Sequence, residues 1–115
     1  MMNKHCLFCK IIAGEIPADK LYEDDDFLAF RDISPQAPVH FLLIPKKHIV
    51  GPAFLEVEDE QLMGRMMRTG ARLAKELGLI DGYRMIFNNG AAAGQTVFHI
   101  HLHVLGGRQL LWPPG

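Results

Sequence analysis

The sequence has few cysteines, no long apolar run and almost no excess of charge of either sign. Cys6 and Cys9 are its only cysteines, which argues against an extracellular disulfide framework and favours a cytoplasmic location. No window is apolar over the length of a membrane span, so we expect no membrane partner. The net charge of −1, from 12 Lys and Arg against 13 Asp and Glu, argues against a nucleic-acid polymer as partner.

What is present suits one globular domain. The chain has 115 residues, of which 49% are hydrophobic and 22% are charged. No internal repeat, linker or low-complexity run divides it, so residues 1–115 are expected to form a single domain. A chain of this length can bury a sufficient core without disulfides or a metal ion.

The pattern of apolar residues predicts an α+β domain with a mainly antiparallel sheet. A helical period and a closing Gly78 predict one long helix over residues 58–77, and a shorter helix is expected over residues 7–13. Strands grouped around one long helix are typical of this fold class. The expected strands cover residues 21–23, 27–31, 40–44, 83–87 and 97–105.

Three histidines alternate with aliphatic residues in the last expected strand. His99, His101 and His103 are separated by Ile100 and Leu102, which is the two-residue period of a strand. We therefore expect all three rings on one face, with neighbouring rings roughly 7 Å apart. Rings at that spacing can engage one small ligand together.

This alternation has three interpretations. The rings can be polar residues on an exposed sheet face, although such faces usually carry Lys, Glu or Thr. They can be ligands of a hydrolytic metal, but the strand has no acidic companion. They can also form a covalent bond to phosphorus, since a neutral imidazole is a good nucleophile near pH 7. The preceding loop favours the interpretation at phosphorus, because it supplies hydrogen-bond donors for an anion. These are the side-chain amides of Asn88 and Gln95, the hydroxyl of Thr96 and the backbone N–H groups near Gly94.

Residues 94–108, GQTVFHIHLHVLGGR, resemble the signature of the histidine triad (HIT) family, in the branch of histidine triad nucleotide-binding proteins. The resemblance extends over nearly the whole chain, through residues 30–38, 44–48, 82–84 and 112–115. It implies a HIT-like fold with a five-stranded antiparallel sheet, one long helix and one short helix. It also implies a homodimer in which the two sheets join into one sheet of ten strands.

The activity that this resemblance implies is hydrolysis of the P–N bond of adenosine or guanosine 5′-phosphoramidates, with no cofactor required for the chemistry. His101 would attack the α-phosphorus and carry the nucleotidyl group until water removes it. His103 would contact the α-phosphate oxygens, while the His99 carbonyl and His40 would orient the catalytic ring. An alternative is a non-catalytic adaptor that binds AMP or GMP and contacts another protein, and a second is a zinc hydrolase that uses the triad as ligands.

The nucleotide-binding residues are also implied by the resemblance. Phe8, Phe30 and Ile33 would enclose the purine, and Asp32 would accept hydrogen bonds from both ribose hydroxyls. Without the resemblance, Phe30 and Ile33 would be read as core, Asp32 as a turn residue and His40 as an interior histidine. The phosphate and its sugar would be held by Asn88, Gly94, Gln95, Thr96, Val97 and His103.

Cys6 and Cys9, three residues apart on a short helix, can grip one ion or form a redox pair. Some bacterial members of the family bind structural zinc through such a pair, and the resemblance then implies Cys6, Cys9, His48 and His99 as ligands. The alternative is two buried thiols beside the core. For the terminal residues from Trp112 to Gly115, the resemblance implies a place near the partner's site, whereas composition alone indicates a stiff tail.

Overall fold

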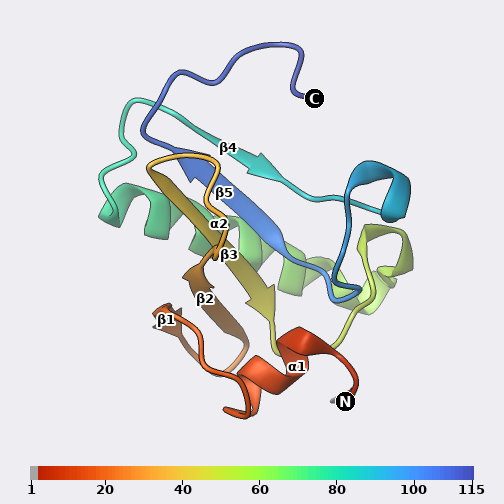
Figure 1. Ribbon diagram of the computed structural model, residues 1–115. Coiled ribbons are helices and arrows are strands. Elements are labelled where there is room, and N and C mark those ends of the chain that lie inside the picture. Colours follow the sequence, from red (N-terminus) through yellow and green to blue (C-terminus); the bar gives the residue numbers. More distant parts are fainter. Residues whose placement is uncertain (1–2) are drawn as a thin grey trace.

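The structure is a computed structural model that describes residues 3–115, so the first two residues of the expected domain lie outside the described residues. Five strands form one antiparallel sheet in the order β1-β2-β3-β5-β4, with one short and one long helix, which confirms the expected fold class (Figure 1). The strands are β1 (Lys20–Glu23), β2 (Phe27–Arg31), β3 (Val39–Pro45), β4 (Tyr83–Ile86) and β5 (Leu102–Gly106), and the helices are α1 (Leu7–Ile12) and α2 (Glu60–Glu76).

The central strands β2 and β3 are buried on both faces, which is why they read as continuous apolar runs in the sequence. Phe41 and Leu43 face α2, together with other residues of the larger core cluster. Leu42 and Ile44 face α1 on the opposite side of the sheet. The period of two along each strand therefore assigns α1 and α2 to opposite faces.

The long helix α2 covers one face of the sheet (Figure 1). It approaches β5 closely at Gly70, where a Cβ atom would lie only 3.0 Å from Cδ2 of Leu102. It begins at Glu60 and not at residue 58, because residues 57–59 form a tight 3₁₀ turn closed by Glu56 and Asp59. Among residues 3–115, no helix has the length and apolarity to cross a bilayer.

The last strand begins at Leu102, so the prediction of one strand over residues 97–105 is wrong for its first part. The backbone bends before it: the Ile100 N–H donates to the Ile49 carbonyl across a 2.6 Å distance, which is not a bond of the sheet ladder. The ring of His99 donates to the Pro45 carbonyl at 2.7 Å. Residues far away in the sequence thus turn this segment away from the straight path that the alternation predicted.

Candidate functional site

Three histidine rings, from His40, His101 and His103, form an imidazole cluster beside β3 and β5. His40 lies on β3, His103 lies on β5, and His101 comes directly before β5. Nε2 of His40 is 3.0 Å from Nδ1 of His103, and the ring centroids of His101 and His103 are 5.0 Å apart. The ring of His99 also lies on the α1 side, 6.0 Å from the Phe8 ring, but the bend at residues 97–99 turns it toward the cysteines and not toward His103. The expected spacing of about 7 Å is wrong for His101 and His103, whose rings are closer.

The ring of His101 is held by a backbone carbonyl. Its Nδ1 lies 2.8 Å from the carbonyl oxygen of His99, and because a carbonyl only accepts, Nδ1 must carry the proton. In the neutral ring Nε2 then holds the lone pair. The His99 carbonyl thus contacts the His101 ring, as the resemblance implied, and it sets which nitrogen of His101 can attack.

A backbone amide determines the tautomer of His40, which is opposite to the tautomer of His101. The Gln36 N–H donates to Nδ1 of His40 at 3.0 Å, so the proton of the neutral ring is on Nε2. Nε2 then donates to Nδ1 of His103, which leaves His103 with its own proton on Nε2. His40 therefore orients His103, whereas the resemblance implied that it orients the catalytic ring. Sequence reasoning missed Gln36 because a backbone N–H has no residue signature.

Asp32 follows β2 and faces the imidazole cluster. One carboxylate oxygen accepts from the Ser34 N–H at 2.8 Å, which forms the turn that composition alone suggested. The other oxygen lies 3.4 Å from Nε2 of His40 and 3.9 Å from Nδ1 of His103. Its negative charge beside both rings acts to raise the pKa of His40 and that of His103.

Burial opposes that effect and is the larger cause. It lowers the pKa of His40 and that of His101. Burial, with the neighbouring rings of His101 and His40, also lowers the pKa of His103 to about 4, although Asp32 acts in the raising direction. The three rings are therefore neutral at pH 7, and a neutral ring is what a nucleophile at Nε2 of His101 requires.

The expected purine-binding residues divide into two groups. Phe8 and Phe30 are buried and pack edge to face, with ring centroids 5.5 Å apart, and Phe8 also meets the ring of His101 at 5.0 Å. Ile33 is 98% exposed on the loop after β2. The structure therefore brings the two phenylalanines together beside His101 and leaves Ile33 at the surface.

The loop over residues 88–97 carries the expected phosphate-binding residues. Gly94 has a φ of 92°, a left-handed conformation that favours glycine, and the side chain of Asn88 lies about 4.0 Å from where a Cβ of Gly94 would be. Thr96 is exposed and Val97 is half-buried. Their hydroxyl and amide donors are thus accessible to an anion.

Gln95 differs from its neighbours because its side chain points into the protein. It is 3% exposed, its Oε1 accepts from the Gly90 N–H at 2.8 Å, and its Nε2 donates to the carbonyls of Val50 and Val97 at 2.7 and 3.2 Å. Its side-chain amide thus binds loop backbone on both sides. This is a positioning role in the 88–97 loop, which the sequence could not separate from direct phosphate contact.

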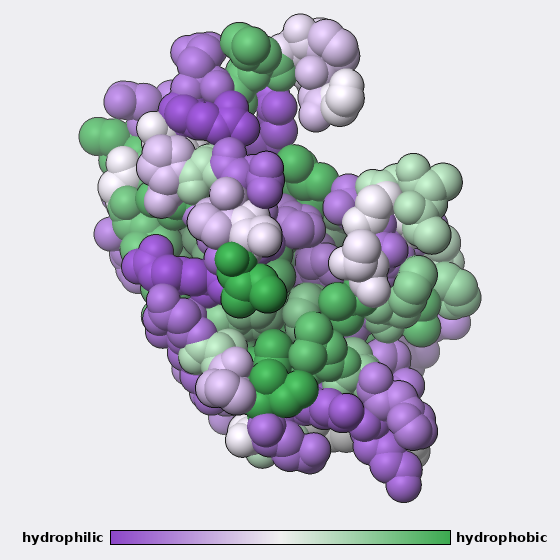
Figure 2. Space-filling view, in the orientation of Figure 1, coloured by the Kyte–Doolittle hydropathy of each residue, from purple (hydrophilic) through white to green (hydrophobic). Residues whose placement is uncertain are grey.

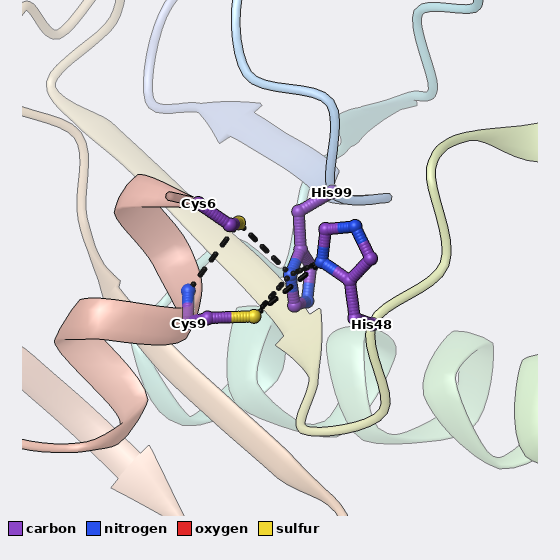
Figure 3. Close-up of side chains that lie close together, drawn as sticks. All are labelled: Cys6, Cys9, His48 and His99. Carbon is purple, nitrogen blue, oxygen red and sulfur yellow. Dashed lines mark hydrogen bonds between the residues drawn. The ribbon is translucent and has the colours of Figure 1, made fainter. Parts of the chain in front are cut away.

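Cys6, Cys9, His48 and His99 form a second group, the cysteine–histidine cluster (Figure 3). Nδ1 of His99 lies 3.4 Å from Sγ of Cys6 and 3.6 Å from Sγ of Cys9. Nδ1 of His48 lies 3.4 Å from Sγ of Cys9 and 3.2 Å from Nδ1 of His99. The two thiols are free, and the ligand atoms come from α1, the loop after β3 and the bend before β5.

These distances fit a tetrahedral metal ion. With Zn–S near 2.3 Å and Zn–N near 2.0–2.1 Å, tetrahedral angles put S and N about 3.6 Å apart and two N atoms about 3.4 Å apart. Nε2 of His99 donates to the Pro45 carbonyl, so its Nδ1 lone pair faces the sulfurs. Burial lowers the pKa of His99 to about 4, which keeps it neutral, and raises the pKa of Cys6, so a metal must displace the thiol proton.

Asp32, His40 and His103 also offer three ligand atoms close together. Their hydrogen bonds argue against a metal there: Nδ1 of His40 already accepts from the Gln36 N–H, so its Nε2 carries a proton where a metal would need a lone pair. The two clusters therefore suit different chemistry, with a metal held at the sulfurs and a proton held between His40 and His103.

A pocket joins the cysteine–histidine cluster to the 88–97 loop. Its lining includes Cys6 and His48 of the cluster and Thr96 and Val97 of the loop, together with Phe98. Figure 2 shows hydrophobic surface over this part of the molecule, near α1, where Leu7 and Phe98 are both exposed. The cluster is thus close to solvent on the side where the 88–97 loop lies.

Comparison with known proteins identifies the family. The HIT domain matches residues 13–110, and an uncharacterized HIT-like protein of Synechococcus elongatus is 52% identical over 99% of this chain and 100% of its own length. The chain belongs to the HIT family. A solved HIT family hydrolase from Legionella pneumophila is 53% identical, with a TM-score of 0.94 over 96% of this chain and 99% of its own, which supports a hydrolase or transferase kind.

Two further solved structures bear on ligands. A histidine triad nucleotide-binding protein from Candida albicans is 37% identical, with a TM-score of 0.78 over 86% of this chain and 72% of its own. A zinc-bound histidine triad family protein from Mycobacterium smegmatis is 43% identical, with a TM-score of 0.78 over 91% of this chain and 76% of its own. Together with the ligand distances here, the latter makes structural zinc chemically consistent with this chain.

Proposed function

We propose that this protein is a purine nucleoside phosphoramidase that hydrolyses the P–N bond of adenosine or guanosine 5′-phosphoramidates. The observation that carries the proposal is the bond from Nδ1–H of His101 to the His99 carbonyl, which leaves the lone pair on Nε2 of a buried neutral ring. A donor, the Nε2–H of His103, belongs to the adjacent ring. A nucleophile beside a hydrogen-bond donor is the arrangement that phosphoryl transfer needs.

In the proposed reaction, Nε2 of His101 forms a bond to the α-phosphorus while the P–N bond breaks. The electron pair of that bond leaves with the amine nitrogen, which takes up a proton from solvent. Water then attacks the phosphorus of the nucleotidyl-histidine and loses a proton to solvent, while the P–Nε2 bond breaks and its electron pair returns to the ring, which releases the nucleoside monophosphate. His103 would donate to a phosphoryl oxygen during both steps, and Asn88, Gly94, Thr96 and Val97 would hold the remaining oxygens, while Gln95 would hold the loop in place.

The nucleoside would lie against the aromatic side of the site. Phe8 and Phe30 would form the apolar wall, with Ile33 closing over the base from its exposed loop. Asp32 would accept from the ribose hydroxyls through the oxygen that lies closest to His40. Zinc at the cysteine–histidine cluster would be structural, and no cofactor would enter the chemistry.

We also propose a homodimer. The sheet ends at β1 and β4, so a continuous ten-stranded sheet needs one of these edges to pair with its copy. The β4 edge includes Tyr83, whose side chain is 38% exposed, and Arg84 binds the Leu111 carbonyl of the terminal segment that leads to Trp112. Light scattering with size-exclusion chromatography measures the mass; a monomer at micromolar concentration would contradict this proposal.

The decisive test of the activity is intact mass after rapid quenching with adenosine 5′-phosphoramidate, followed by peptide mapping. One added adenylyl group on His101 is expected. Binding of AMP without any turnover would instead favour the adaptor alternative. Turnover that disappears on removal of metal from folded protein, with His101 never adenylylated, would favour the zinc hydrolase.

A further inference from the structure

The cysteine–histidine cluster draws its ligands from three chain segments, and each of these segments also touches the nucleotide site. Cys6 and Cys9 come from α1, His48 from the loop after β3, and His99 from the bend before β5 (Figure 3). An ion bound to all four ligands therefore fastens the three segments to one another. The consequence depends on what the next residue of each segment contacts.

The shortest connection runs through His99 itself. Its Nδ1 faces the two sulfurs, and its own carbonyl accepts the proton of Nδ1 of His101. One residue is thus a metal ligand through its ring and the holder of the catalytic ring through its backbone. The Pro45 carbonyl holds the other nitrogen of the same ring, so the His99 residue is fixed on both sides next to the peptide that binds His101.

The second connection runs along the segment after His48. The Ile49 carbonyl accepts from the N–H of Ile100, and the Val50 carbonyl accepts from Nε2 of Gln95. Gln95 in turn holds the backbone of the 88–97 loop at Gly90. His48 is therefore two residues away from the clamp that positions the phosphate donors.

The third connection is α1. Phe8 lies between Cys6 and Cys9 in the sequence, and its ring meets the His101 ring at 5.0 Å and nearly at a right angle. It also packs against Phe30. Binding of an ion to the cysteines fixes α1 and with it the aromatic surface against the catalytic ring.

We propose that a divalent metal ion at the cysteine–histidine cluster organises the nucleotide site, so that metal and nucleotide bind with positive cooperativity. The proposal rests on the proposed function for the class of nucleotide. The metal class is that of Zn²⁺ and Co²⁺, which accept two thiolates and two imidazoles in tetrahedral geometry. Coupling between two binding sites is reciprocal, so nucleotide must raise the metal affinity by the same factor.

The test measures both sides of this cycle by titration calorimetry. We expect AMP to bind the Zn²⁺-loaded protein about tenfold more tightly than the chelator-treated protein, and Zn²⁺ to bind the AMP complex more tightly by the same factor. Circular dichroism first establishes that the chelator-treated protein is folded. Equal AMP affinities with and without Zn²⁺ in folded protein would overturn the proposal.

Co²⁺ supplies a second readout that does not involve turnover. Thiolate-bound Co²⁺ absorbs in the visible, so the bands report the cluster directly. AMP should shift the Co²⁺ titration to lower concentration by the same factor. A Co²⁺ titration that is identical with and without AMP counts against the proposal.

Three variants separate coupling from general destabilisation. Cys9→Ser should lose the Zn²⁺ effect on AMP binding, and it also corrects for direct binding of Zn²⁺ to AMP. His5→Ala, which removes an exposed ring of the same N-terminal segment, should keep the full effect. Gln95→Glu cannot donate to the Val50 carbonyl, so it should reduce the coupling factor while Zn²⁺ binding without AMP stays at its wild-type value.

The outcomes also distinguish this proposal from the proposed function. If AMP binds equally well with and without metal while His101 becomes adenylylated, the phosphoramidase stands and the coupling is wrong. If AMP binds neither form, the nucleotide site itself is wrong and the coupling falls with it. If Gln95→Glu keeps the full coupling factor, the connection through Gln95 is wrong, and only those through His99 and Phe8 can carry the coupling.

Discussion

Both clusters contain histidine rings, and the hydrogen bond at one nitrogen of each ring gives these rings different roles. In the cysteine–histidine cluster, Nε2 of His99 donates to the Pro45 carbonyl and Nδ1 faces two sulfurs. In the imidazole cluster, Nδ1 of His101 donates to the His99 carbonyl and Nε2 is left with the lone pair. Function therefore follows from which nitrogen the backbone occupies.

The largest expected effect comes from His101→Asn. Loss of the proposed nucleophile should lower kcat/KM for adenosine 5′-phosphoramidate at least about a thousandfold, because in the other two rings of the imidazole cluster Nε2 carries a proton. Steady-state assays with fluorescent or chromatographic detection of AMP measure it. Zn²⁺ binding and melting temperature should be unchanged, and retention of more than a tenth of the activity would remove His101 from the mechanism.

The second-largest effect is on stability, and it concerns the cysteine–histidine cluster and not the imidazole cluster. Zn²⁺ at about 100 times its dissociation constant should stabilise the wild type by about 2.7 kcal/mol, a rise in melting temperature of about 10 °C for a domain of this size. Cys9→Ser should show no rise with added Zn²⁺, since one ligand at Sγ is lost. Differential scanning fluorimetry with and without Zn²⁺ gives the comparison, with His5→Ala as the control that keeps the rise.

A smaller effect is expected at the amide that fixes His40. Gln36→Pro removes the N–H that donates to Nδ1 of His40, so both tautomers of His40 become accessible and His103 loses its fixed donor. We expect kcat to fall about tenfold, the size of one hydrogen bond. Gln36→Ala keeps the N–H and should retain kcat. ¹⁵N chemical shifts of the His40 ring measure the tautomer, and a shift pattern equal in both variants would contradict this reading.

The smallest effect is on stability against pH. The pKa of His103 is lowered from 6.5 to about 4 by burial, so between these values the unfolded chain binds a proton that the folded protein does not. As far as this ring is concerned, the free energy of unfolding is therefore highest above pH 6.5, and it decreases as the pH falls from 6.5 toward 4. His40, His101 and Asp32 face this ring, and only Asp32 opposes the trend.

Urea unfolding at two pH values measures that dependence. Between pH 7 and 5.5 we expect the wild type to lose about 1 kcal/mol more than His103→Asn, which has no ring to titrate. The other buried histidines contribute equally to both proteins and cancel in the difference. Equal losses in the two proteins would mean that the His103 ring is as easily protonated in the folded protein as in the unfolded chain.

Much of the fold was predictable from the sequence. The runs at residues 27–31 and 40–44 are strands because both of their faces are buried, and the helical period over residues 58–77 gives α2 to within two residues. The last strand was predicted too long, since the alternation of His99, His101 and His103 is also produced by a bent segment. The bend depends on Ile49 and Pro45, which carry no signal of it.

The candidate site divides in the same way. The spacing of Cys6 and Cys9, together with the resemblance to the family, gave four residues whose ligand atoms the structure brings within 4.8 Å of one another. The inward orientation of Gln95 and the pairing of His40 with His103 were not predictable. Side-chain identity gives a residue's chemistry, whereas orientation depends on partners from distant segments.

The sequence by itself determined which groups are present: two thiols, a run of alternating imidazoles, a glycine-containing loop and the apolar periods that build the sheet and α2. Only the tertiary structure decided what each imidazole does. The partners that fix the rings are the carbonyls of Pro45 and His99 and the amide of Gln36. Every residue except proline offers the same backbone donor and acceptor, so their position, set by the packing of the chain, selects the reactive nitrogen.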